Sequence, residues 1–369
     1  MKQHVISEWL LRDFSSGVGS ARRLATYSKV THTFAPDRPE DFMARLDSHP
    51  IDVEHRLQRI ESPAARAARG LVAKALTLPA GITRITDRDE PSDMSTREAG
   101  EAAGFHIVVA ERGAALLGKR ERTALAKFMT LMFTRSPKTE RTIRRIADLY
   151  EQSARLAMAR AGLPPGLREE SEAAVKAAGD EGALRAIDHV RSIGTFIADM
   201  HWWIVRAAPD ERFVLGDTPL AVSVALGYVD EFRPLVGRDS FVLTMPLHPE
   251  VALVATPKPI LPVSGDSGEL VAAINRASWG WAEEQVVAAE VEHLELVRDQ
   301  LPPTMWARVL PVPFDEAAVH LEAAMDVAKV LVGAGWRPVN WDRCYEARLK
   351  SMRSLIQAEP APPQSNVEA

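Results

Sequence analysis

Apolar residues recur at helical spacing over several segments of the chain. Near the N-terminus, Ile6, Leu10 and Phe14 follow one another at four-residue steps, as residues on one face of a helix do. A stronger pattern over residues 53–76 predicts a pair of helices that bends or restarts at Pro63. The same reasoning predicts helices over four further segments, which are 121–137, 138–162, 181–207 and 268–285.

The pattern changes after Pro209 to alternating residues and short apolar runs. Four such runs, separated by Asp, Gly and Pro, predict strands at 212–217, 220–226, 241–247 and 251–256. Another extended stretch is predicted near Tyr27 and Val30. Because the four runs follow one another and do not alternate with helices, we expect an α+β fold, predominantly helical, with a small central antiparallel sheet.

The remaining segments predict one domain with a mobile loop and a disordered tail. Residues 78–118 are rich in Gly, Pro, Asp and Ser, which predicts a mobile loop with little regular structure. The last segment, 356–369, is polar and rich in proline, as disordered tails are. We therefore expect a single α+β domain over residues 1–355, followed by a disordered tail.

Composition narrows the class of protein. Hydrophobic residues make up 46% of the chain and charged residues 26%, a balance typical of globular proteins. The formal net charge of −5 gives no support for nucleic-acid binding. Cys344 is the only cysteine, so no intrachain disulfide and no thiolate metal cage can form. The N-terminus lacks a secretion signal and no stretch is apolar enough to cross a membrane, so we expect a cytoplasmic protein without a membrane partner.

The stretch RFVLGDTP, from Arg212 to Pro219, contains the most suggestive polar residue. Asp217 follows an apolar run and stands between Gly216, which permits unusual backbone angles, and Thr218-Pro219. A carboxylate aimed from the end of a rigid strand often faces a ligand. The alternative is that Asp217 caps its own turn by accepting backbone N–H bonds.

Other candidates are weaker when taken singly. Glu61 lies near the apolar stripe of its predicted helix and is a possible acid, base or cation ligand, with a solvated face as the alternative. Arg135 either closes its own helix or reaches inward to clamp an anion. The basic stretch that follows, with Lys138 and Arg141, can contact phosphate or form a solvated helix face. No H-E-x-x-H pattern or phosphate-binding glycine loop is present, so no metal or nucleotide cofactor is identified.

Several segments together resemble a bacterial family known as domain of unknown function 4238. Its pattern is matched, in chain order, by HVISEWLLRDF, LATYSKVT, LQRIES, KFMTLMFTRSP, FVLGDTPL, MPLHPEVALVAT and VAAINRA. The resemblance covers residues 2–288 and departs from the pattern at Ser7, usually proline, and Thr218, usually asparagine. Loss of the asparagine amide removes any contact made through that group.

The resemblance implies a set of functional positions in this chain. They are His4, Glu61, Arg135, Asp217 and Asn275, and Thr218 joins Asn275 as an expected substrate-binding position. The set suits polar chemistry, with His4 or Asp217 as general base, Arg135 on a developing anion and Glu61 as orienting group or metal ligand. This favours a hydrolase or nuclease-like enzyme that acts on a phosphate- or carbonyl-containing substrate.

Two other interpretations remain open. The same groups can recognise a small anionic ligand or a partner without turnover, as a binding or regulatory module does. They can also form a purely structural polar network, with Asp217 and Arg135 paired inside the protein. The cofactor, the substrate and the oligomeric state are not given by the sequence.

Overall fold

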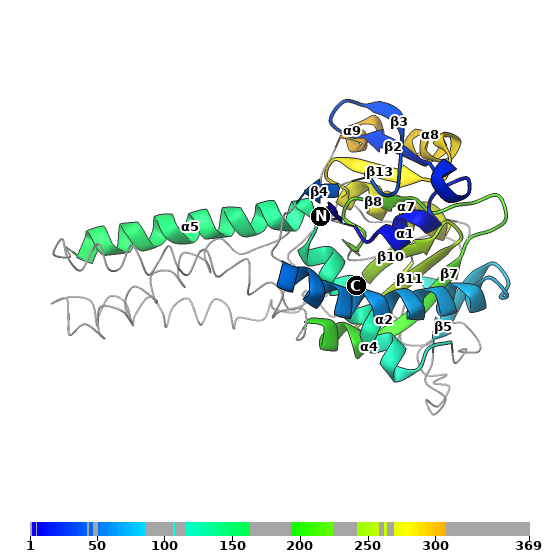
Figure 1. The fold of residues 1–369 in the computed structure, drawn as a ribbon, viewed down its shortest axis with the longest axis horizontal. Coiled ribbons are helices and arrows are strands. Elements are labelled where there is room, and N and C mark those ends of the chain that lie inside the picture. Colours follow the sequence, from blue (N-terminus) through cyan, green and yellow to red (C-terminus); the bar gives the residue numbers. More distant parts are fainter. Residues whose placement is uncertain are drawn as a thin grey trace, which may run out of the picture. The chain divides into compact units, whose positions relative to one another are not determined.

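Antiparallel sheets form the centre of the fold in the computed structural model (Figure 1). The structure describes residues 2–4, 6–42, 44–46, 51–85, 106–107, 116–161, 193–223, 242–257, 262–263 and 269–307. Every strand pair in these ranges is antiparallel. The predicted α+β class and the antiparallel pairing are therefore confirmed.

The larger sheet has five strands among the described residues. Their order across the sheet is β5 (Gly81–Ile85), β7 (His201–Arg206), β11 (Val251–Thr256), β10 (Val242–His248) and β9 (Ala221–Ser223). All residues of β11 are buried, as are the central four residues of β7. This sheet is larger than the small one predicted.

The second sheet has four strands, in the order β3 (Thr33–Asp37), β2 (Leu24–Ser28), β13 (Gln285–Ala288) and β8 (Leu215–Gly216). It brings together chain segments that lie more than 250 residues apart, because β13 pairs with both β2 and β8. Two short pairs complete the description: β1 (Lys2–His4) with β4 (Ala44–Leu46), and β6 (His106–Ile107) with β12 (Pro262–Val263).

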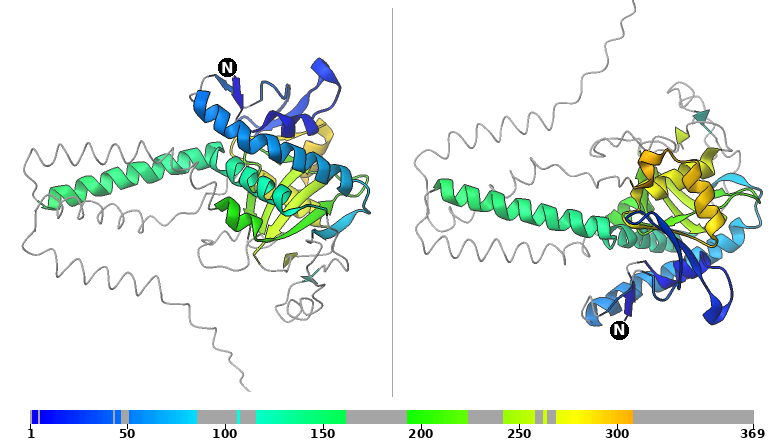
Figure 2. Two further views of the ribbon diagram at one scale, coloured as in Figure 1. Left: turned by 60° about the horizontal axis from the view of Figure 1, so that its bottom comes forward. Right: turned by 90° about the horizontal axis from the view of Figure 1, so that it is seen from above.

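The helices pack on these sheets. The longer ones are α2 (Ile51–Ala75), α4 (Lys119–Thr134), α5 (Pro137–Ala161), α7 (Leu270–Trp281) and α8 (Val291–Asp299), and the shorter ones are α1 (Glu8–Asp13), α9 (Pro303–Trp306) and the 3-10 helix Gly19–Ala21. Helix α2 packs on α4, α7 contacts β8, β9 and β10, and α8 contacts β2 and β13. Figure 2 shows α2 and α4 beside the five-stranded sheet. None of the described helices has the length and apolar character needed to cross a bilayer.

Four fully buried tryptophans of the core, Trp202, Trp203, Trp279 and Trp281, each donate a hydrogen bond from the ring nitrogen. Trp202 and Trp281 are fully buried, and their indole N–H groups donate to the carbonyls of Ile197 (2.9 Å) and Val222 (2.7 Å). A buried indole that keeps a hydrogen bond loses little on leaving water. Trp281, at the end of α7, therefore ties this helix to β9.

Three predicted elements differ from the structure. Residues 201–206 form strand β7, where a helix was predicted; the run of Trp202 to Val205 is short and apolar throughout, a pattern that periodicity cannot assign. Helix α2 is one helix that continues through Pro63, where a bend or a restart was predicted. Strand β5 lies inside the predicted loop 78–118, whose remaining residues are partly outside the described ranges.

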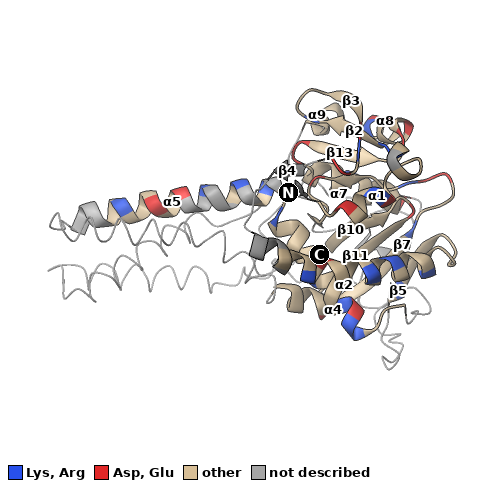
Figure 3. Ribbon diagram, viewed as in Figure 1, with Lys and Arg blue, Asp and Glu red and all other residues tan. Residues whose placement is uncertain are grey.

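The chain divides into two compact units, Met1–Arg145 with Gly182–Phe314 and Ile146–Glu181 with Asp315–Ala369. The described part of the second unit is residues 146–161 of α5, where the acidic Asp148 and Glu151 precede the basic Arg155; Figure 3 shows both kinds of charge along this helix. One such pair joins Glu151 to Arg155, one turn apart. The single domain over residues 1–355 stays a prediction, and the tail 356–369 lies outside the described residues.

Two glycines give a matched test of the packing around β8. A Cβ added at Gly216 would lie 2.8 Å from the carbonyl oxygen of Ser278 and 2.9 Å from Cβ of Ala282, so one of these must shift. A Cβ at Gly70, inside α2, would meet no atom within 4 Å. We expect Gly216→Ala to lower the free energy of unfolding by about 1–3 kcal/mol. Gly70→Ala should raise it by about 0.5–1 kcal/mol.

Urea denaturation monitored by circular dichroism measures both effects. Equal stability of Gly216→Ala and the natural protein would contradict the close approach of β8 to α7.

Candidate functional site

Asp217 lies at the end of β8 and is fully buried. Its carboxylate accepts three backbone N–H bonds, from Glu283 (2.7 Å) to Oδ1 and from Glu284 (2.6 Å) and Gln285 (2.9 Å) to Oδ2. Its own N–H donates to the carbonyl of Gln285 at 3.0 Å. Asp217 therefore holds the distant turn between α7 and β13, and these bonds do not serve its own turn, the alternative considered from the sequence.

Burial is the main influence on the charge of Asp217. Loss of water raises the pKa of this carboxyl group, whereas the three backbone N–H bonds and the positive charge of Lys29 lower it. The carboxylate is thus surrounded by donors that favour its ionised form.

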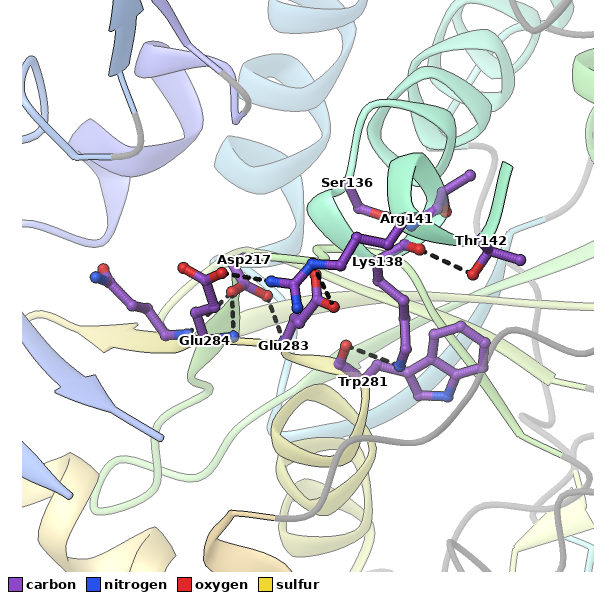
Figure 4. Close-up of polar contacts among 10 residues, drawn as sticks. Ser136, Lys138, Arg141, Thr142, Asp217, Trp281, Glu283 and Glu284 are labelled. Carbon is purple, nitrogen blue, oxygen red and sulfur yellow. Dashed lines mark hydrogen bonds and ion pairs between the residues drawn. The ribbon is translucent and has the colours of Figure 1, made fainter. Parts of the chain in front are cut away.

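Two buried lysines approach the same turn from different elements. Lys29 follows β2, is 3% exposed, and donates from Nζ to the carbonyls of Trp279 and Ala282 at 2.8 Å each. Lys138, also 3% exposed, donates to the carbonyl of Trp281 at 3.1 Å and lies 4.2 Å from the centre of that indole ring (Figure 4). The carbonyls at the end of a helix attract cations, so both lysines stabilise the C-terminus of α7.

The start of α5 fixes the position of Lys138. Ser136 precedes the helix and its Oγ accepts the N–H bond of Thr139 at 3.2 Å, as an N-cap residue does. Pro137 occupies the first helical position, where its fixed backbone angle favours the helix. The segment Arg135-Ser136-Pro137 of the family pattern is therefore a helix start that aims Lys138 at the end of α7.

Burial perturbs both lysines strongly. It lowers the pKa of Lys138 to about 7, an effect to which the charge of Lys29 adds and which Asp217 and Glu283 oppose. It lowers the pKa of Lys29 to about 8, again opposed by Asp217 and Glu283. Lysines with such pKa values exchange protons near neutral pH and are characteristic of functional sites.

Three further charged side chains, of Arg141, Glu283 and Glu284, complete the group. Arg141, 60% exposed, forms ion pairs with Glu283 (3.2 Å) and Glu284 (2.5 Å). Burial raises the pKa of Glu283, whereas Arg141 lowers it. Oε2 of Glu283 is buried and has no hydrogen-bond partner among the described residues. We call the whole group the α7 turn cluster: Lys29, Lys138, Arg141, Asp217, Glu283 and Glu284. Figure 4 labels all of these residues except Lys29.

Two of the other predicted site residues pair with each other. Glu61, on α2, forms an ion pair with Arg135 at the end of α4, 2.8 Å long. The backbone of His4 pairs with Ala44 in β1, but its side chain lies outside the described part of the structure.

The two predicted substrate-binding residues are both buried. Asn275, on α7, accepts the N–H bond of Val214 (3.0 Å) and donates to the carbonyl of Arg212 (2.9 Å), so it holds the segment that leads into β8. Thr218 is fully buried, and its hydroxyl has no hydrogen-bond partner among the described residues. Whether these groups act on a substrate stays a prediction.

Sequence reasoning missed the two buried lysines. Lys138 belongs to a basic stretch that was interpreted as a solvated face, but only Arg141 of this pair is exposed. Lys29 gave no signal, since it follows an ordinary strand. The position of Lys138 directly after Ser136-Pro137 could have indicated that it is not solvated. This position makes it the second residue of a helix, where a solvated cation is unfavourable.

Metal binding gains no support from the described residues. Among them, no group of three or more His, Cys, Asp or Glu side chains is arranged to hold a metal ion. In the α7 turn cluster three cations accompany the three carboxylates, and both oxygens of Asp217 already accept backbone N–H bonds, so the cluster is poorly suited to a metal ion.

Comparison with known proteins identifies the family. The family described as "Protein of unknown function (DUF4238)" matches residues 2–292, most of the chain, and the chain belongs to it. No match was found among the curated proteins or among the solved structures.

The lowered pKa of Lys138 predicts how stability depends on pH. In the folded protein this pKa is about 7, against 10.5 for an ordinary lysine. Between these values the unfolded chain binds more protons at this residue than the folded chain, so the free energy of unfolding rises with pH. In Lys138→Met this contribution is absent. The natural protein should therefore show a slope steeper by about 1 kcal/mol per pH unit between about pH 7.5 and 9.5.

Urea denaturation at several pH values measures this slope. Lys119→Met, at an exposed position at the start of α4, is the matched control and should keep the slope of the natural protein. Equal slopes for Lys138→Met and the natural protein would show that Lys138 is charged throughout this range.

Proposed function

We propose that this member of the DUF4238 family is a binding module that recognises a small anionic ligand at the α7 turn cluster. The observation that carries the proposal is that the amine of Lys138 makes fewer hydrogen bonds than it has donors. Its amine is buried, yet it makes one hydrogen bond among the described residues, although an ammonium group has three donors. A ligand oxygen would supply the missing acceptor.

Arg141 strengthens the case for an anion. It lies three residues after Lys138 on α5, so the two side chains share one side of the helix. Its ion pairs with Glu283 and Glu284 involve a largely exposed guanidinium, and exposed pairs are weak. Arg141 can therefore exchange a glutamate for a phosphate or carboxylate of the ligand, which its planar group binds through two bonds.

Asp217 has a positioning role in this proposal. Both of its oxygens already accept backbone N–H bonds, so they are poorly placed to take a proton from a substrate. The same bonds hold the turn that carries Glu283 and Glu284. This is the main reason to rank binding above hydrolysis with Asp217 as base.

Hydrolysis of a phosphate- or carbonyl-containing substrate is the second candidate, favoured by Lys138 and Glu283 together. An amine with a pKa near 7 accepts a proton at neutral pH, and a carboxyl group with a raised pKa can return one to a leaving group. Catalysis by His4, Asp217, Arg135 and Glu61 stays a prediction, as does the cytoplasmic location.

Sulfate is a suitable probe because it does not titrate near neutral pH. An anion beside Lys138 favours its charged form, so binding should weaken as pH rises above about 7, by up to tenfold per pH unit. We expect Lys138→Met to lose sulfate binding. Lys138→Arg should keep binding but lose the pH dependence, because arginine stays charged. Isothermal titration calorimetry at several pH values measures these affinities.

Lys119→Met is again the control and should bind sulfate as the natural protein does. Binding that is equally strong at all pH values, or that survives in folded Lys138→Met, would refute the proposed site. Release of nitrophenol from nitrophenyl phosphate or nitrophenyl acetate, lost in Lys138→Met, would establish the hydrolase candidate instead.

A further inference from the structure

The carboxylate of Glu283 is held in one orientation within the α7 turn cluster. The backbone N–H of Glu283 donates to Oδ1 of Asp217 at 2.7 Å, and its Oε1 forms an ion pair with Nε of Arg141 at 3.2 Å. The side chain is 10% exposed, so the protein surrounds it on most sides. These contacts fix both the start and the end of the side chain, and they leave Oε2 as its second acceptor.

This second oxygen lacks a donor. Oε2 of Glu283 is buried and accepts no hydrogen bond among the described residues. Nearly all buried polar atoms in proteins have a partner, and a charged acceptor without one is especially unfavourable. The raised pKa of Glu283, caused mainly by burial, agrees with a carboxylate that is short of donors. A hydrogen-bond donor from a ligand would satisfy Oε2.

The neighbouring amine of Lys138 has the opposite deficit. Its Nζ binds the carbonyl of Trp281, two residues before Glu283, at 3.1 Å and makes no second hydrogen bond among the described residues. Figure 4 shows Lys138 and Arg141 reaching from α5 to the turn that carries Trp281 and Glu283. The same turn therefore presents donors that lack acceptors and an acceptor that lacks a donor. A ligand that fits both must combine anionic oxygens with a hydrogen of its own.

The solvent-exposed side of the cluster gives such a ligand a way in. Arg141 is 60% exposed and its partner Glu284 is 42% exposed, whereas Glu283 is 10% exposed. An exposed ion pair contributes little stability. Arg141 can therefore give up Glu284 for a ligand oxygen while it keeps its bond to Oε1 of Glu283.

We propose that Glu283 makes the anion site selective for hydrogen phosphate over sulfate, an inference that rests on the binding function proposed above. Inorganic phosphate keeps a P–OH group at neutral pH, and this group donates to Oε2 of Glu283. Its other oxygens accept bonds from Lys138 and Arg141. Sulfate has a similar shape but no hydrogen, so one of its oxygens faces the carboxylate oxygen without a bond and with like charge.

Isothermal titration calorimetry of the full chain at neutral pH measures this preference. The natural protein should bind inorganic phosphate at least about tenfold more tightly than sulfate, given the strength of a hydrogen bond to a charged group. Glu283→Gln should bring the two affinities to within about twofold of each other, because the side-chain amide can donate to either anion. Glu284→Gln is the matched control: it frees Arg141 for both anions alike and should keep the ratio of the affinities.

Methyl phosphate tests the natural protein without any substitution. The second pKa of a phosphate monoester is about 6, so at neutral pH most of this compound has lost the P–OH group. It should therefore bind about as weakly as sulfate. Binding as tight as that of inorganic phosphate would overturn the role of Glu283.

Sulfate separates a failure of this inference from a failure of the anion site itself. If sulfate binds the natural protein and is lost in Lys138→Met, the site exists. Equal affinities for phosphate and sulfate, or a preference that survives in folded Glu283→Gln, would then overturn the selectivity alone. If neither anion binds at millimolar concentration, both proposals are overturned.

Discussion

The carboxylate of Asp217, buried and bound to three backbone N–H groups, is the interaction on which this fold and its candidate site depend. An isolated carboxylate in a protein interior is strongly unfavourable, and it persists when donors replace the lost water. Here the donors come from three successive residues of one turn. The bonds therefore stabilise the charge and, in return, fix the path of the chain from α7 into β13.

The position of several other groups follows from this turn. Lys29 and Lys138 bind carbonyls at the end of α7, and the side chains of Glu283 and Glu284 extend from the turn itself toward Arg141. Strand β13 then pairs with β2 and β8. The four-stranded sheet and the α7 turn cluster thus share one anchor.

The segment from Arg212 to Asp217 leads into this anchor. Asn275 binds the backbone of its first residues, and Asp217, its last residue, binds the turn between α7 and β13. This arrangement gives the family positions Asp217 and Asn275 a common physical role, which is to hold one segment rigidly at its two ends.

Much of this architecture could be predicted from the sequence, and there are physical reasons why the remaining features could not. Helices α4 and α7 have clear periodicity, strands β10 and β11 are short apolar runs bounded by Asp and Pro, and RFVLGDTP was recognised as an unusual strand end. Strand β7 was mispredicted because its apolar run directly continues a helical pattern, with no Gly or Pro between residues 195 and 206 to separate the two. The turn that Asp217 binds and the carbonyls that Lys29 binds could not be predicted, because these partners lie far from Asp217 and Lys29 along the chain.

Residue-resolved hydrogen exchange of the amides of Glu283, Glu284 and Gln285 tests the role of Asp217 most directly. These N–H groups should exchange slowly in the natural protein and at least about tenfold faster in Asp217→Asn, given the strength of hydrogen bonds to a charged group. Amides of β10 and β11 should keep their protection, and Asp210→Asn, at an exposed position, should change neither set. Unchanged protection of the three turn amides in Asp217→Asn would contradict the account.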